Sequence, residues 1–203
     1  MQVSLSPAAQ KTADILSSLR STFAEKGFDG ASMQDLARAA GMSASNFYRY
    51  FPSKAAIIEA MIMADLDRMG QDLELALLTN DPLAEMRSQI RARIKHHQCC
   101  QDGTLWAEIH AVSLRRPEIA QIMSRMENQV TALLVKVFSA RTGLSSDAAE
   151  QVFASKASLI IALFRSAAMI GSPDSAVKAQ LTEQIITVIE RTLDDIASAA
   201  RKA

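Results

Sequence analysis

Residues 32–54, SMQDLARAAGMSASNFYRYFPSK, predict two short helices joined by a tight turn. In the first helix the apolar side chains are spaced three and four apart and so share one face: Met33, Leu36, Ala37 and Ala40. Ser32 can cap the start of this helix, and Gly41 can adopt the positive φ that lets the chain leave it sharply.

The second helix of this segment has one inward and one outward side. Ser43 can cap it, and Phe47 and Phe51 are four apart and can pack inward. The outward residues are small at the front and then aromatic or cationic: Ala44, Ser45, Asn46, Tyr48, Arg49 and Tyr50. An exposed helix of this kind suits the major groove of DNA. The segment therefore predicts a helix-turn-helix.

Residues 12–61 resemble the DNA-binding domain of TetR-type transcriptional regulators. The matching features run through the whole segment: Ile15-Leu16, Phe23, Gly27-Phe28, Ser32-Met33, Leu36-Ala37, Ala40-Gly41, Ser43, Phe47-Tyr48, Phe51 and Lys54. Beyond this segment only the helical architecture resembles the family, because its remaining domain varies widely in sequence.

The resemblance implies roles for individual residues. It places Ala44, Ser45 and Asn46 at base-reading positions, where Asn46 can pair with adenine and Ala44 can touch a thymine methyl group. It places Tyr48, Tyr50 and Lys54 at phosphate-contacting positions, to which Ser32 can add a contact. Arg49 can reach either guanine or a phosphate. Capping alone explains Ser43, and packing of the helix end is the alternative for both tyrosines.

The rest of the chain predicts an all-α protein of about nine helices. Helix formers dominate the 203 residues, and most of the seven glycines and five prolines stand where helices would end. Beyond the helix-turn-helix we expect helices over residues 53–78, 82–99, 104–115, 117–140, 146–170 and 174–199. Pro82 suits a first helical position, Asp102-Gly103 predicts a turn with Thr104 as the cap after it, and Ser145 can open the helix that follows Gly143. We expect a DNA-binding domain over residues 1–54 and an effector-binding and dimerisation domain over residues 55–203.

Charge and composition favour a cytoplasmic protein but do not by themselves indicate DNA binding. Through Ala55 there are six Lys or Arg against four Asp or Glu, a difference of two in a chain of net charge zero. No apolar run is long enough to span a bilayer, and the N-terminus has no signal pattern. The two cysteines, Cys99 and Cys100, are adjacent and form no disulfide framework.

The last two long helices are apolar over more than one face, which predicts a homodimer. The first carries a stripe with spacings of three and four: Val152, Ser155, Leu159, Ala162, Leu163, Ser166, Ala167 and Ile170. The second carries Leu181, Ile185, Ile186, Val188, Ile189 and Leu193. Such helices need burial on two sides, and the resembled family pairs two of them with the symmetric pair of a second subunit. The alternative is the core of a monomer.

In the resembled family a small molecule binds among the middle helices and releases the DNA. Candidate residues for an apolar or aromatic effector are Met63, Leu66, Met86, Ile90, His97, Trp106, His110, Met123, Met126 and Phe164. Trp106 and His110 are four apart and can form an aromatic wall with one polar group, while Arg93 is the alternative to His97 as a second polar contact. For each of these residues an ordinary core position is the competing interpretation.

Several alternatives are weaker. His96 and Cys100 have the i, i+4 spacing of two metal ligands, and the two cysteines could sense oxidation. We expect neither a metal site nor a cofactor, because no CxxC or HxxxH pair supports one. An enzyme is disfavoured because the chain has three histidines, no phosphate-binding glycine loop and no nucleophile elbow, so we assign no catalytic residue. A nonspecific architectural DNA-binding protein is a further alternative. The sequence thus predicts a dimeric, ligand-responsive transcriptional repressor that binds operator DNA.

Overall fold

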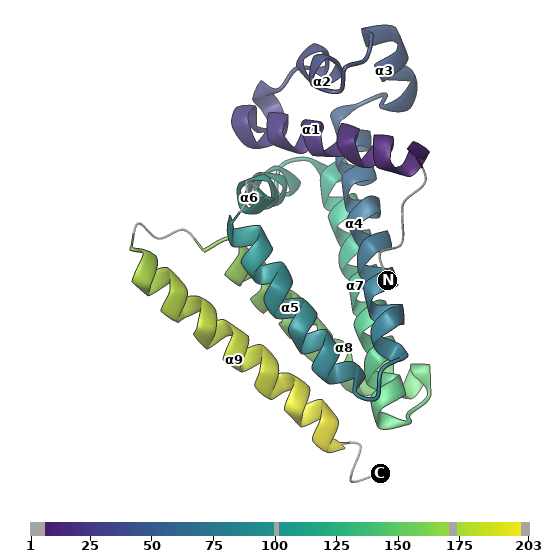
Figure 1. The fold of residues 1–203 in the computed structure, drawn as a ribbon, viewed down its shortest axis with the longest axis vertical. Coiled ribbons are helices and arrows are strands. Elements are labelled where there is room, and N and C mark those ends of the chain that lie inside the picture. Colours follow the sequence, from purple (N-terminus) through teal and green to yellow (C-terminus); the bar gives the residue numbers. More distant parts are fainter. Residues whose placement is uncertain (1–6, 100–101, 171–173, 200–203) are drawn as a thin grey trace. The chain divides into compact units, whose positions relative to one another are not determined.

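A computed structural model describes residues 7–99, 102–170 and 174–199, and these residues form helices without strands (Figure 1). The helices are α1 (Pro7–Gly30), α2 (Met33–Ala39), α3 (Ala44–Tyr50), α4 (Lys54–Leu77), α5 (Pro82–Cys99), α6 (Asp102–Ser113), α7 (Pro117–Thr142), α8 (Ser146–Ala168) and α9 (Ser175–Ala199). The predicted all-α fold is confirmed. No helix within the described ranges is long and apolar enough to cross a membrane.

Most helix boundaries follow the capping signals. Ser32, Ser43 and Ser145 each accept a hydrogen bond from a backbone N–H in the first turn of the following helix. The prediction that Thr104 caps α6 is wrong, since the helix already begins at Asp102. Gly103 lies in the first turn of α6, where N–H groups have no partner within the helix whichever residue is present. Gly103 is therefore part of the helix and does not mark a turn.

The chain divides into two compact units that cut across the sequence. Unit 1 combines Met1–Asp65 with Gln101–Met123, and unit 2 combines Leu66–Cys100 with Ser124–Ala203. Helices α4 and α7 each contribute to both units. The boundary predicted at residue 54 concerns which residues contact DNA and stays a prediction, whereas the units are defined by packing.

Unit 1 adds α6 to the helices of the helix-turn-helix region. Leu105, Ile109 and Val112 of α6 are buried, and α6 lies beside α1 (Figure 1). On the α1 side, Phe23 and Phe28 stack with ring centroids 6.0 Å apart. Helix α6 is therefore part of the support on which α1 rests, although it lies outside the segment that resembles a DNA-binding domain.

Unit 2 is built on a core shared by α5, α7, α8 and α9, with the end of α4. Phe138 of α7 and Phe153 of α8 meet edge to face, 6.0 Å apart, inside this core. Helices α8 and α9 lie side by side (Figure 1). Two arginines of α5 join it to α9: Arg87 pairs with Asp194 at 2.6 Å, and Arg91 pairs with Glu190 at 2.8 Å and with Glu183 at 3.1 Å.

A polar group of α5 also holds α8 and α9. The Gln98 Nε2 atom donates to the Ala167 carbonyl of α8 and to the Thr182 hydroxyl of α9, both at 2.8 Å. Thr182 is buried, so this amide satisfies polar groups that water reaches poorly. The two C-terminal helices are consequently fixed to α5 by both polar and apolar contacts.

Candidate nucleic-acid interface

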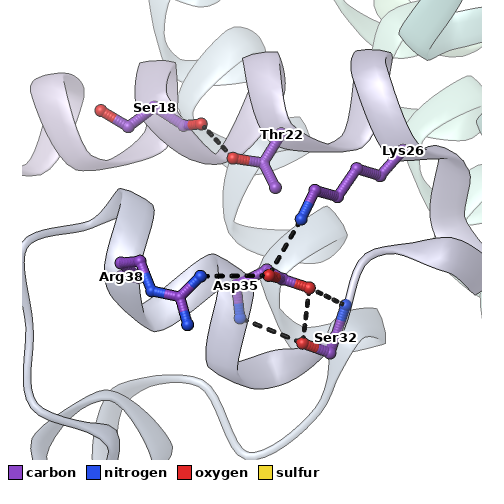
Figure 2. A network of polar contacts seen from close by, with 6 residues as sticks. All are labelled: Ser18, Thr22, Lys26, Ser32, Asp35 and Arg38. Atoms are coloured by element: carbon purple, nitrogen blue, oxygen red, sulfur yellow. Dashed lines mark hydrogen bonds and ion pairs between the residues drawn. The ribbon is translucent and has the colours of Figure 1, made fainter.

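The start of α2 is fixed by a reciprocal capping box centred on Asp35. The Ser32 hydroxyl accepts from the Asp35 N–H at 3.1 Å, and the Asp35 carboxylate accepts from the Ser32 N–H at 3.1 Å and from its hydroxyl at 2.6 Å. Lys26 of α1 and Arg38 of α2 approach the other carboxylate oxygen at 2.9 and 3.5 Å, as Figure 2 shows. The hydrogen bonds from Ser32, followed by that from Lys26, hold the pKa of Asp35 well below its ordinary value. The network links the start of α2 to α1.

A glycine-centred turn ends α2. Gly41 has a φ of 64°, its N–H donates to the Arg38 carbonyl at 3.0 Å, and the Met42 N–H donates to the Ala37 carbonyl at 3.0 Å. This pair of bonds is the Schellman motif, which needs a left-handed residue that glycine supplies at little cost. The predicted role of Gly41 is confirmed, and the turn sets the direction in which α3 departs.

Helix α3 has the predicted inward and outward sides. Phe47 is completely buried and its ring centroid lies 5.2 Å from that of Phe51. The predicted reading residues are all exposed: Ser43, Ala44, Ser45, Asn46, Tyr48, Arg49 and Tyr50. Truncating a buried Phe to Ala costs about 3–5 kcal/mol, so Phe47 is a strong anchor for so short a helix. The exposed face is thus held on a rigid support.

Two of the exposed side chains are paired with each other. The Arg49 guanidinium donates to the Asn46 Oδ1 atom at 3.0 Å and also lies over the Tyr50 ring, 5.4 Å from its centroid. A bidentate contact with adenine uses both the oxygen and the nitrogen of the Asn46 amide, so Arg49 would have to move away first. Breaking the hydrogen bond between Arg49 and Asn46 should cost little free energy, because both side chains are exposed to water.

Lys54 has a structural role that the sequence did not reveal. Its Nζ donates to the Phe28 carbonyl at 2.6 Å and to the Asp29 carbonyl at 3.2 Å, and it lies 5.2 Å from the centre of the Phe28 ring. An ammonium group has three hydrogens. After these two bonds one hydrogen is left for the phosphate contact that the family resemblance implies.

Sequence reasoning overlooked one exposed cation on α2. The Arg38 side chain is 79% exposed, and its bond to Asp35 is long. Leu36 and Ala37 are buried, so helical spacing alone could have placed Arg38 on the exposed side of α2. Arg38 joins the residues able to contact DNA phosphates.

The comparisons with known proteins agree with this geometry. The family model described as "Bacterial regulatory proteins, tetR family" matches residues 15–61, the segment that forms α2, α3 and their flanking helices. Over these residues the chain is similar to the TetR family of regulators. The HTH-type transcriptional regulator UidR of Escherichia coli K12 is 27% identical over 126 residues, which cover 60% of this chain and 61% of UidR.

Two further known proteins are similar to this chain over different extents. RutR of Escherichia coli K12, also an HTH-type transcriptional regulator, is 35% identical over 88 residues, covering 43% of this chain and 41% of RutR. The solved structure of AibR with isovaleryl coenzyme A and operator DNA has a TM-score of 0.58 at 16% identity, covering 88% of this chain and 97% of AibR. The curated relatives are thus matched over less than two thirds of their length, and the similarity to AibR is one of fold.

The predicted effector residues divide between the two units. Met63, Trp106, His110 and Met123 belong to unit 1. Met123 is buried, Trp106 and His110 are partly buried, and Met63 is 43% exposed. The Trp106 Nε1 atom is buried and has no hydrogen-bond partner among the described residues.

In unit 2 the structure brings two of the predicted effector residues together. His97 of α5 meets Phe164 of α8 edge to face, with ring centroids 5.6 Å apart. Met86 and Ile90 lie in the core of unit 2. The remaining two differ in burial, with Leu66 buried and Met126 partly buried. Arg93, the alternative polar contact, is paired with Asp72 at 2.6 Å.

The metal and redox alternatives fall largely outside the described residues. Cys100 is not among them, and the side chain of Cys99 is not described either. Among the side chains that are described, no group of three or more His, Cys, Asp or Glu residues is arranged to hold a metal ion.

Proposed function

We propose that this protein is a sequence-specific DNA-binding transcriptional regulator that reads its operator with α3. The observation that carries the proposal is the exposed face of α3 above the buried Phe47, with Ser43 as the cap at the start of the helix and Phe51 as the cap at its end. Ala44, Ser45 and Asn46 would contact bases, while Tyr48, Tyr50, Lys54 and Ser32 would contact phosphates. Arg49 would serve either purpose.

The proposed regulator acts as a homodimer through α8 and α9. Val152 and Leu159 of α8 are 55% and 45% exposed, and Leu181 and Val188 of α9 are 42% and 43% exposed. Each pair is seven residues apart and therefore lies on one helical face, while Ile160 and Ile189 of the same helices point into the core. A second copy of the chain would cover these faces and present two α3 helices to successive turns of DNA, about 34–36 Å apart.

The proposed regulator is a repressor that a small apolar or aromatic molecule releases from DNA. The similarity of residues 15–61 to the TetR family supports both repression and its release by a small molecule. Such an effector needs a higher affinity for the conformation that does not fit the operator, and the difference in affinity sets the largest possible response. We expect a cytoplasmic protein without catalytic activity. Control by oxidation or by a metal at His96–Cys100 is the alternative.

Selection of binding sites from a random duplex library by the purified protein tests this function. We expect one sequence with two similar half-sites to be enriched, which a nonspecific architectural protein would not produce. On that duplex Asn46→Ala should lose about 1–3 kcal/mol and discriminate less at one base pair in each half-site. Tyr48→Phe, which removes only the hydroxyl of an exposed side chain at a phosphate-contacting position, should weaken selected and random duplexes alike. Equal losses for both variants on both duplexes would refute this division of labour.

A further inference from the structure

Helix α1 is kinked at Gly27, near its C-terminal end, and an acidic side chain of α6 holds the corner formed by residues 27–29. The Glu108 Oε1 atom accepts a hydrogen bond from the Phe28 N–H at 3.0 Å, although the two residues are 80 positions apart in sequence. Phe28 is buried, so this N–H needs a partner within the protein. Both residues belong to unit 1.

The backbone at the corner is shaped to receive this carboxylate. Gly27 has φ 70° and ψ 169°, a conformation that only glycine adopts without strain. A Cβ atom at Gly27 would lie 3.2 Å from the Glu108 Oε1 atom. The glycine thus provides both the bend and the space for close approach of the carboxylate.

Cations complete the support of the corner. The Lys54 ammonium binds the Phe28 and Asp29 carbonyls, as described above, and the Arg116 guanidinium pairs with the Asp29 carboxylate at 3.0 Å. The Glu108 carboxylate thus accepts from the N–H of the corner, and the Lys54 ammonium donates to its carbonyls. Both are charge-assisted hydrogen bonds, which are stronger than neutral ones. The corner is held by α4, by α6 and by the residues between α6 and α7.

We propose that Glu108 is a positioning residue for DNA reading, a role that rests on the function proposed above. The direction of α2 relative to α1 is set at this corner, and the Gly41 turn then carries that direction to α3. Base contacts tolerate errors of only a few tenths of an ångström in the position of the reading helix. Without the Glu108 acceptor the corner relaxes and the bases are read less well, while phosphate contacts persist.

Three substitutions at Glu108 separate hydrogen bonding from charge. Glu108→Gln keeps an oxygen of the same reach but removes the charge. Glu108→Asp keeps the charge, but its side chain is one methylene too short to accept from Phe28. Glu108→Ala removes both. If the hydrogen bond positions the corner, Gln should resemble wild type and Asp should resemble Ala, whereas a role of charge alone predicts the reverse order.

Glu25→Ala provides a matched control for the charge. Glu25 is an exposed carboxylate of α1 in the same unit. Removing any negative charge near DNA should strengthen binding slightly, so charge alone predicts tighter binding for both Glu25→Ala and Glu108→Ala. The proposed role predicts weaker specific binding for the Glu108 variant only.

The experiment measures affinity for the duplex selected by the wild-type protein and for a scrambled duplex of the same composition. Measurements are made at a temperature at which circular dichroism shows every variant folded, and the active fraction is fixed by stoichiometric titration. We expect the ratio of the two affinities to fall roughly tenfold for Glu108→Asp and Glu108→Ala, and less than about threefold for Glu108→Gln.

The outcomes separate this inference from the proposed function. Failure of the wild-type protein to select any duplex would refute the function itself. Selection by wild type together with an unchanged affinity ratio for a folded Glu108→Asp protein would refute the role of Glu108. A loss in Glu108→Gln as large as that in Glu108→Asp would also refute it, because the hydrogen bond would then not be the decisive contact.

Discussion

Replacing Gly27 with alanine tests the shape of the corner near the C-terminal end of α1 most directly. The conformation of Gly27, φ 70° and ψ 169°, costs a residue with a Cβ atom about 1–3 kcal/mol. The new Cβ atom would also lie 3.2 Å from the Glu108 Oε1 atom and 3.8 Å from its Cδ atom. Displacing that carboxylate stretches its bond to the Phe28 N–H, which contributes about 1 kcal/mol. We therefore expect Gly27→Ala to destabilise the protein by about 2–4 kcal/mol.

Two other glycines provide internal controls. Gly41 has a φ of 64° with nothing within 4 Å of a Cβ atom, so Gly41→Ala should show backbone strain alone, about 1–2 kcal/mol. Gly70 lies inside α4 at an ordinary φ with the same open space, so Gly70→Ala should stabilise by about 0.5–1 kcal/mol. The expected order of stability is Gly70→Ala, wild type, Gly41→Ala and Gly27→Ala.

The assay is equilibrium unfolding in urea at one fixed protein concentration, because dimerisation links stability to concentration. The fluorescence of the single tryptophan, Trp106 of α6, reports on unit 1, and circular dichroism reports on all helices. Comparing the two probes shows whether the units unfold together. In the Glu108→Ala background, Gly27→Ala should cost less than in wild type because the crowded carboxylate is gone.

A destabilisation of less than about 0.5 kcal/mol by Gly27→Ala would refute this reasoning, since it would mean that the corner relaxes without cost. Equal costs for Gly27→Ala in the wild-type and Glu108→Ala backgrounds would show instead that only backbone strain is involved.

Three further predictions concern other parts of the protein. Because the hydrogen bonds to Asp35 lower its pKa, its stabilising effect is complete above the ordinary carboxyl pKa and is lost as the pH falls toward the lowered pKa. The melting temperature of Asp35→Asn should thus lie below that of wild type at pH 7, with the gap closing toward pH 2, and a gap independent of pH would contradict this. Leu159→Glu with Val188→Glu should yield a folded monomer in sedimentation velocity with weaker operator binding, and a dimer of unchanged affinity would exclude these faces as the interface. Gln98→Ala leaves the Thr182 hydroxyl and a carbonyl of α8 without their donor and should cost about 1–3 kcal/mol in urea unfolding, whereas exposed Gln184→Ala should change little.

Local signals predicted much of the helical architecture. Pro82 at a first helical position and the capping serines gave helix boundaries that the structure reproduces, because capping involves residues only two or three positions apart. Thr104 failed as a cap because Gly103, next to it, was interpreted as a turn although it lies inside a first helical turn. Such errors arise where one residue type suits two local structures.

The sequence by itself determined the helix-turn-helix and the side of α3 that faces outward. Phe47 and Phe51 at i, i+4 fix the buried side, and the residues between them then have to face solvent. Only the tertiary structure decided that Lys54 binds the carbonyls of the corner and that Glu108 holds its N–H. These partners lie 26 and 80 residues away, and helical spacing carries no information over such distances.

The sequence did contain one indication of the role of Glu108. This residue stands three positions after Leu105 and four before Val112, so helical spacing places it on the buried face of α6. A carboxylate on such a face requires a donor, but only the folded chain identifies that donor as the Phe28 N–H. The reading face of the protein is therefore a local property of α3. The corner that aims it is a property of three segments brought together by folding, because a buried N–H takes its partner from whatever the tertiary fold places beside it.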